Sequence, residues 1–467
     1  MNHPRKRVLV IGLDSAPPEL VFDRWPDQLP VFKRLASNGI YGALESTIPS
    51  ITCPAWATMV TGRDPGRLGI YGFRNRTRYD YGEMSFVDSS WINVDCVWDT
   101  LARYGKRSIL LGIPPTYPPR PVNGLMVSCF LAGDTSATYT YPKNFKQEVE
   151  AASGGYVMDV KDFRTGEKGQ VLNSIYRMTA NRFRLARTLI QKKDWDFFMM
   201  VEMGTDRIQH AFWRFFDKEH PRYCPDTEFS DAILGYYRYL DREIGKILNL
   251  IENDTTVMLV SDHGAKRFEG GICVNEWLIR NGYLRLKEYP QRPTPFRELK
   301  VDWGRTAAWA ESGFYGRVFM NVQGREPLGT IPAHDYQRVR NEIAHGLEEI
   351  VGPRGRRLDT SAFRPQDIYP EVRGIAPDLL VYFDDQRCRS IGSVGHNSLW
   401  TDQNDNGSDD ANHSQHGIFI MHDPAGPHTP GKRDGLNIKD VAPTILAEFE
   451  VPSPDGLEGR RIGQNGV

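Results

Sequence analysis

Short apolar runs alternate with amphipathic stretches along most of this chain. Six runs of four or five residues are rich in Val, Ile, Leu, Met and Phe, which is typical of strands buried on both faces of a parallel sheet. These predicted strands are residues 8–11, 108–111, 197–201, 257–260, 379–382 and 418–421. Helical patterns lie between them, at residues 29–38, 55–61, 97–104, 171–191, 231–252 and 438–449. The alternation predicts an α/β fold with a doubly wound, mostly parallel sheet, whose ligands bind at the carboxyl ends of the strands.

The α/β rhythm weakens between residues 265 and 412, where Arg, Pro and Gly become more frequent. The strand pattern resumes at residue 417 and is followed by a last helical stretch. We therefore predict a metal-binding catalytic core formed by residues 1–264 together with residues 413–467. Residues 265–412 are predicted to be a cap or insertion that contributes to the substrate pocket.

Net charge, the length of the first apolar run and cysteine spacing limit the ligands and the location that we expect for this protein. The formal net charge of the 467 residues is −1, which argues against a nucleic-acid polymer or an anionic membrane as the ligand. The first apolar run is too short for a signal peptide or a membrane span, so we expect no membrane span. Six cysteines are scattered without a Cys-x-x-Cys pair, which favours reduced thiols and a cytoplasmic location. Nothing in the pattern indicates an oligomeric state.

The segment 51–62 places a hydroxyl where a helix is predicted to begin. Thr52 is a candidate N-cap, Pro54 falls in the first turn, and Gly62 is a C-terminal stop signal. A helix N-terminus carries partial positive charge and free N–H donors, so it suits a phosphoryl group. An ordinary N-cap has the same pattern, so a functional interpretation depends on the other residues that accompany Thr52.

Candidate metal ligands follow the predicted strands. They are Asp14, Asp206, His210, Asp262, His263 and His413. Asp206 and His210 are four residues apart, which places both on one face of a helix. Asp and His side chains in such numbers suit two divalent cations lying close together. Thr52, as an alkoxide, could bind one of these cations and attack phosphorus.

The order of these motifs resembles that of the alkaline phosphatase superfamily. The closest branch is the predicted phosphohydrolase/phosphomutase group, which is related to type I phosphodiesterases and nucleotide pyrophosphatases. The resemblance covers nearly the whole chain and is carried by Val10-Ile11-Gly12-Leu13-Asp14, Thr52-Cys53-Pro54-Ala55-Trp56, Asp206-x-x-x-His210, Ser261-Asp262-His263-Gly264 and Asp409-Asp410-Ala411-Asn412-His413.

The resemblance implies a metal-dependent phosphohydrolase that acts on a small phosphate ester, either a diester or a monoester. It implies two zinc ions, with manganese as an alternative in one site. One ion would be held by Asp206, His210 and His413, with His416 as the alternative to His413. The other ion would be held by Asp14, Thr52, Asp262 and His263. Thr52 would be the catalytic nucleophile and would form a phospho-threonine intermediate.

Two departures and two competing functions remain open. Nucleotide pyrophosphatases carry an Asn three residues after the nucleophile, where this chain has Ala55, so Arg74, Arg76 or a backbone N–H is a candidate replacement donor. Cys53 is followed directly by Pro54 without the Arg of the sulfatase motif, which disfavours a sulfatase. A phosphomutase or phosphotransferase is the alternative function, and a non-catalytic binding protein that retains the fold is the third.

Overall fold

A ten-stranded, mostly parallel sheet forms the centre of the molecule and confirms the predicted α/β class. The structure is a computed structural model that describes residues 6–82, 84–225, 227–252, 254–405, 407–426 and 428–463. The strand order is β20-β2-β19-β9-β1-β8-β5-β6-β7, and β21 also pairs with β2. The strands are β1 (Val8–Leu13), β2 (Ile40–Glu45), β5 (Ser108–Leu111), β6 (Gly124–Val127), β7 (Thr140–Tyr141), β8 (Phe197–Glu202), β9 (Thr256–Val260), β19 (His416–His422), β20 (Gly431–Lys432) and β21 (Leu436–Asn437).

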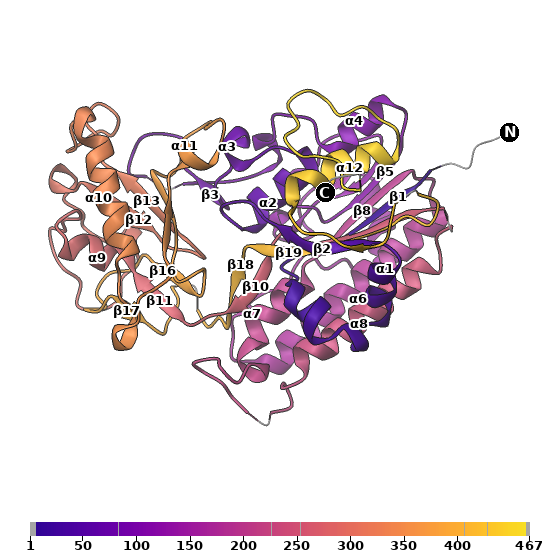
Figure 1. Cartoon of the computed structure of the whole chain (residues 1–467), viewed down its shortest axis with the longest axis horizontal. Helices are drawn as coiled ribbons and strands as arrows, with labels where there is room; N and C mark the ends of the chain where they lie inside the picture. Colours follow the sequence, from indigo (N-terminus) through magenta and orange to yellow (C-terminus); the bar gives the residue numbers. More distant parts are fainter. Residues whose placement is uncertain are drawn as a thin grey trace.

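Helices cover both faces of this sheet, as the doubly wound prediction requires (Figure 1). On one face, α2 contacts α12, which also contacts α4. On the other, α1 packs on α8, and α6, α7 and α8 pack on one another. The helices of this body are α1 (Pro30–Ser37), α2 (Thr52–Thr61), α3 (Pro65–Leu68), α4 (Val97–Arg103), α5 (Phe145–Ser153), α6 (Lys168–Lys192), α7 (Gly204–Phe216), α8 (Ala232–Leu248) and α12 (Val441–Glu448). All six predicted helices are present, with ends shifted by a few residues.

Four of the predicted strands, now β9, β1, β8 and β5, are consecutive parallel neighbours at the centre of the sheet.

The predictions for the other two strands are wrong in part. Residues 418–421 lie in the central sheet, but their strand β19 runs antiparallel to both β9 and β2. The chain arrives at β19 at the carboxyl edge of the parallel strands, so it can only run back down the sheet. Residues 379–382 form a strand, β15, that belongs to a different, antiparallel sheet. A four-residue apolar run has the same pattern in any buried sheet.

The smaller lobe (residues 270–401) lies beside the body built on the central sheet and is drawn mainly in orange in Figure 1. It has a hydrophobic cluster of its own, drawn from residues between Ile272 and Cys388. Its elements are β11 (Gly270–Cys273), β12 (Ala308–Glu311), β13 (Gly316–Met320), β14 (Ser361–Phe363), β15 (Leu379–Tyr382), β16 (Cys388–Ile391), β17 (Trp400–Thr401), α9 (Val274–Arg280), α10 (Tyr336–Glu348) and α11 (Pro365–Ile368).

Two small pairs of strands accompany the two bodies. Strands β10 (Gly264–Arg267) and β18 (Ala411–Ser414) pair antiparallel where the chain leaves the central body and where it returns. A hairpin of β3 (Arg74–Asn75) and β4 (Ser85–Phe86) reaches the smaller lobe, because Tyr81 between its strands stacks on Trp303 with ring centroids 3.8 Å apart. Among the described residues, no helix is long and apolar enough to cross a membrane.

Gly12 in β1 allows Trp56 of α2 to lie directly against the strand. A Cβ atom at Gly12 would lie 2.4 Å from Cη2 of Trp56 and 3.0 Å from Cγ2 of Val201. We expect Gly12→Ala to lower the free energy of unfolding by about 1–3 kcal/mol, because both neighbours are fully buried and cannot move aside. Urea-induced unfolding measures this change. Gly169→Ala is the control, because a Cβ atom there meets nothing within 4 Å. An unchanged stability of the Gly12 variant would contradict the packing.

Candidate metal centre

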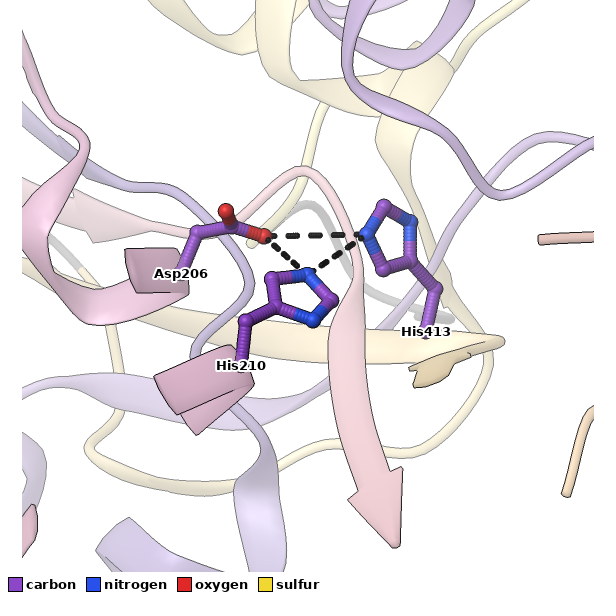
Figure 2. A group of neighbouring side chains, drawn as sticks. All are labelled: Asp206, His210 and His413. Atoms are coloured by element: carbon purple, nitrogen blue, oxygen red, sulfur yellow. Dashed lines mark hydrogen bonds and ion pairs between the residues drawn. The ribbon is translucent and has the colours of Figure 1, made fainter. Parts of the chain in front are cut away.

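The side chains of Asp206, His210 and His413 lie together, although His413 is some 200 residues from the other two in the sequence. Asp206 and His210 lie one turn apart on α7, and His413 lies on β18. Nε2 of His210 is 3.0 Å from Oδ1 of Asp206 and 3.3 Å from Nε2 of His413. Figure 2 shows that the carboxylate and one nitrogen of each ring point toward one another. All three side chains are buried. The structure places His413, and not the exposed His416, beside Asp206 and His210.

A second group consists of Asp14, Asp262 and His263, whose ligand atoms lie within 4.8 Å of one another. Asp14 follows β1, and the other two residues follow the neighbouring strand β9. Oδ1 of Asp14, Oδ2 of Asp262 and Nε2 of His263 are buried and have no hydrogen bond to a residue outside the group, and Nε2 of His263 lies 3.1 Å from Oδ2 of Asp262 and 3.8 Å from Oδ1 of Asp14. The ring of His263 stacks on His413 with centroids 3.8 Å apart, so the two groups are adjacent.

One oxygen of each orphaned carboxylate is held by the protein, and the other is turned inward. Nε1–H of Trp56 donates to Oδ2 of Asp14 at 2.8 Å. The backbone N–H of Ser15 donates to Oδ1 of Asp262 at 3.1 Å. Unmatched buried oxygens are costly, and two carboxylates with an imidazole are a donor set that suits a divalent cation. The residues of this group therefore fit a metal ion.

The three histidines are oriented in the same way. Nδ1 of His263 faces the carbonyl oxygen of Gly264 at 3.0 Å, and Nδ1 of His413 faces the carbonyl oxygen of Ser50 at 3.1 Å. Nδ1 of His210 faces the carboxylate of Asp409 at 2.8 Å. These acceptors hold the proton on Nδ1, which leaves Nε2 to bind a metal.

The surroundings shift the pKa values of the three carboxyl groups in different directions. Burial raises the pKa of Asp14 to about 8, and the nearby charge of Asp206 adds to the rise. Burial and the charge of Asp14 also raise the pKa of Asp262 well above its usual value. Burial acts on Asp206 in the same direction, but the charges of His210 and Arg207 outweigh it and hold its pKa well below the usual value. A divalent cation is the partner that would keep all three groups ionised.

Two of the imidazoles are held neutral by their surroundings. Burial lowers the pKa of His413 to about 4. Burial, together with the neighbouring His413, lowers the pKa of His263 well below its usual value. Burial also opposes the charge on His210, but Asp206 and Asp409 outweigh it and raise its pKa.

Asp409 connects the first group to the smaller lobe. Its Oδ1 accepts from His210, and its Oδ2 is 2.9 Å from the guanidinium groups of both Arg164 and Arg389. Arg389 lies on β16 and is fully buried, with Nη2 donating to the carbonyl oxygen of Ala411 at 2.6 Å. Burial opposes ionisation of Asp409, but Arg389 and His210 lower its pKa, so the carboxylate stays charged.

Thr52 lies on a segment that is held to both groups. The carbonyl oxygen of Ser50, two residues before it, accepts from His413, and Trp56, four residues after it, donates to Asp14. The prediction that Thr52 is the N-cap is wrong. Ile51 occupies that position with extended backbone angles, and Thr52 is the first residue of α2. Because no side chain caps this helix, its first N–H groups are not taken by a cap. Gly62 ends α2 with a positive φ, as predicted.

The arginines that were candidate phosphate donors are engaged elsewhere or exposed. Nη1 of Arg76 is 3.2 Å from Oε1 of Glu326, and its guanidinium lies over the rings of Trp309 and Phe319. Arg74 is exposed. Backbone N–H groups at the start of α2 therefore remain the candidate donors.

A third cluster of possible ligands lies elsewhere and has its own charge balance. Asp423, His428 and Glu448 offer ligand atoms within 4.8 Å of one another. Nζ of Lys6 is 3.0 Å from Asp423 and 3.1 Å from Glu448, and Arg461 is 3.7 Å from Glu448. Two cationic side chains thus neutralise the two carboxylates, so this cluster does not require a metal.

Sequence reasoning missed the residues that orient the candidate ligands. Trp56 was quoted only as part of a motif. It is fully buried, and its indole N–H also fixes Asp14. Asp409 was quoted only as part of a motif. Its position four residues before His413 gave no sign that it would contact His210. Ser50 gave no signal at all, because its role depends on contacts made across more than 300 residues.

The comparisons with known proteins establish the family of the chain and its fold. The family model described as type I phosphodiesterase / nucleotide pyrophosphatase matches residues 8–418. No curated protein matches the chain by sequence. The chain therefore belongs to the type I phosphodiesterase / nucleotide pyrophosphatase family, within the alkaline phosphatase superfamily, and is a phosphoric ester hydrolase. This assignment sets aside the non-catalytic alternative.

Solved structures share the fold at low sequence identity. Human ectonucleotide pyrophosphatase / phosphodiesterase 5 is 13% identical with a TM-score of 0.54, and 96% of each chain is covered. An inactive threonine-to-alanine variant of the murine protein, in complex with AMP, is 12% identical with a TM-score of 0.52 and the same coverage. Phosphonoacetate hydrolase from Sinorhizobium meliloti 1021, in complex with phosphonoformate, is 16% identical with a TM-score of 0.61, and 94% of each chain is covered.

Proposed function

We propose that this protein hydrolyses small phosphodiesters with Thr52 as its nucleophile and two divalent cations, zinc in the first instance and manganese as the alternative. The observation that carries the proposal is the convergence of orphaned, buried ligand atoms from Asp14, Asp262 and His263 beside the Asp206 group. In this assignment one cation is held by Asp206, His210 and His413. The other is held by Asp14, Thr52, Asp262 and His263.

The start of α2 supports Thr52 as the nucleophile. The helix is ten residues long, has no side-chain cap, and begins at Thr52. Its N-terminal N–H groups and positive end favour a phosphoryl group next to this hydroxyl. The murine protein of the same fold is inactive when a threonine is replaced by alanine, which makes Thr52 the first residue to test here.

The reaction divides into two displacements on phosphorus. Bound divalent cations would supply charge stabilisation on the phosphoryl oxygens and lower the pKa of a hydroxyl group. In the first step Oγ of Thr52 bonds to phosphorus, the bond to the leaving alcohol breaks, and the threonine proton ends on that alcohol. In the second step water replaces Thr52 on phosphorus, and the hydroxyl of Thr52 is restored. His413 is bonded to Ser50 and Asp14 to Trp56, on either side of Thr52 in the sequence, which supports a hydroxyl held between the two groups.

Charge balance favours a diester over a monoester substrate. The arginines that contact the site carboxylates are already paired: Arg207 with Asp159 at 2.6 Å and also with Asp206, and Arg389 with Asp409. A monoester dianion carries one more negative charge than a diester, and no arginine in the described contacts of these carboxylates is left to bind it. The phosphomutase alternative requires a monoester, so the same balance argues against it.

We also propose that residues 265–412 act as the cap of this site and that residues 1–264 and 413–467 carry its ligands. The separate hydrophobic cluster of the smaller lobe supports this division. Phe314 of that lobe stacks on His413 with centroids 3.9 Å apart, so the lobe forms part of the wall around the metal centre. Residues 1–5 and 464–467 of the proposed core lie outside the described residues. A cytoplasmic location stays a prediction from the scattered cysteines, all six of which are free.

Replacing Thr52 by alanine tests the nucleophile. We expect Thr52→Ala to lose at least about 10³-fold in kcat on bis(p-nitrophenyl) phosphate, because no other hydroxyl takes over the first displacement. Release of p-nitrophenol measures turnover, and elemental analysis checks that the metal content is unchanged. Thr58→Ala is the matched control, because Thr58 lies on the same helix and is equally buried. Undiminished turnover by the Thr52 variant would rule out the proposed function.

The number of metal ions bound per chain tests the proposed division of the ligands between two cations. We expect Asp262→Ala to lose about one metal ion per chain, because it removes a carboxylate from one group only. Plasma emission analysis of the purified protein measures the ratio. Asp423→Ala is the control, because Asp423 belongs to the third cluster, which is neutralised by Lys6. An unchanged ratio in the Asp262 variant would contradict the pairing.

Substrate charge distinguishes the hydrolase from the mutase. We expect kcat/KM to be at least about tenfold higher for bis(p-nitrophenyl) phosphate than for p-nitrophenyl phosphate, a difference of about 1.4 kcal/mol in transition-state binding. The comparison is made at one pH with the metal-loaded protein. A preference for the monoester, with transfer of phosphate to an added alcohol, would instead favour a phosphomutase or phosphotransferase.

A further inference from the structure

Ser50 uses three of its polar atoms to connect separate parts of the molecule. Its carbonyl oxygen accepts from Nδ1 of His413 at 3.1 Å. Its backbone N–H donates to the hydroxyl oxygen of Tyr382 at 2.8 Å, and its Oγ accepts from Nε2 of Gln386 at 2.5 Å. The residue is almost fully buried, so water does not compete for these bonds. A residue two positions before Thr52 is thus bound both to a candidate ligand and to the smaller lobe.

The two side chains from the smaller lobe are themselves held in place. Tyr382 ends β15, and its ring packs against Phe363 with centroids 5.3 Å apart. Gln386 lies in the turn that follows, where Asp384, Asp385 and Gln386 have φ values of 52°, 47° and 62°. Three consecutive left-handed residues without a glycine are unfavourable, so the surroundings must impose this turn.

Neighbouring groups that hold the turn can be named. The carboxylate of Asp384 is paired with the guanidinium of Arg356 at 2.5 Å, and the N–H of Asp385 donates to the carbonyl oxygen of Asp359 at 2.6 Å. Nδ2 of Asn412 donates to the carbonyl oxygen of Gln386 at 2.6 Å. Strained backbone of this kind is found where a side chain must be delivered to a fixed position. Here the delivered side chain is that of Gln386, and its target is Ser50.

We propose that Tyr382 and Gln386 are positioning residues that set the place of the Thr52 hydroxyl through Ser50. The proposal rests on the proposed function of Thr52. Both side chains are buried, and both act on the backbone or side chain of Ser50. With the N–H and Oγ of Ser50 fixed, the peptide leading to Thr52 has little freedom to move. A displacement of a reacting atom by about 1 Å can cost about 10²-fold in rate.

The first test separates positioning from substrate binding. With bis(p-nitrophenyl) phosphate as the substrate, we expect Gln386→Ala and Tyr382→Phe each to lower kcat about tenfold while KM changes less than about twofold. Tyr315→Phe is the matched control, because Tyr315 is buried in the same tyrosine cluster but donates to the carbonyl oxygen of Tyr71. We expect it to lower the melting temperature by a similar amount without lowering kcat. Equal kcat in all three variants and the parent would overturn the proposal.

The second test shows whether Gln386 acts through Ser50. In the Ser50→Ala background the acceptor of Gln386 is absent, so Gln386→Ala should lower kcat no further. A tenfold loss in both backgrounds would mean that Gln386 acts by another route and would overturn the proposal. If Gln386→Ala does not fold, the kcat and KM of Tyr382→Phe decide the question. The proposed function fails separately, through activity in Thr52→Ala, and that result does not depend on these variants.

Discussion

The site depends on keeping three carboxylates close together without water. Asp14, Asp206 and Asp262 are each at most 2% exposed, and like charges at such a depth repel strongly. The fold accomplishes this by taking them from the segments that follow three adjacent strands, β9, β1 and β8, whose carboxyl ends meet at one edge. One oxygen of Asp14 and one of Asp262 is held by an N–H donor, which aims the other at the centre. A divalent cation bound here would make this arrangement of charges favourable.

The histidines are also held by one ring atom, which aims the other ring nitrogen at the centre. Each Nδ1 is matched to an oxygen that comes from a different place: a carbonyl of the next residue for His263, a carbonyl before α2 for His413, and a carboxylate for His210. Such partners fix both the tautomer and the ring orientation, and they govern the affinity of metal ligands. The residues that accept from Nδ1 of each histidine would therefore tune how tightly these histidines hold a metal.

The sequence predicted what local spacing and strand order encode. The four central strands, the six helices and the pairing of Asp206 with His210 follow from hydrophobic periodicity and helix geometry. The direction of β19 and the sheet that contains β15 did not follow, because an apolar run is the same in any buried strand. The choice of His413 over His416 came from the resemblance. In the structure His413 is buried beside His210, whereas His416 is exposed. Contacts such as Asp409 with His210 join elements that no sequence period relates.

The segment from Tyr382 to Arg389 in the smaller lobe is bonded to two separate parts of the candidate site. Near one end, Tyr382 and Gln386 bind Ser50 before Thr52. At the other end, Arg389 binds Asp409, which in turn orients His210. Ser50 and the group of Asp206, His210 and His413 are therefore both connected to one short piece of chain. Because buried polar bonds are lost only at a substantial cost, this segment cannot shift relative to one partner without disturbing the other. The position of Ser50 relative to His210 is thus set by the lobe that contributes none of the candidate ligands.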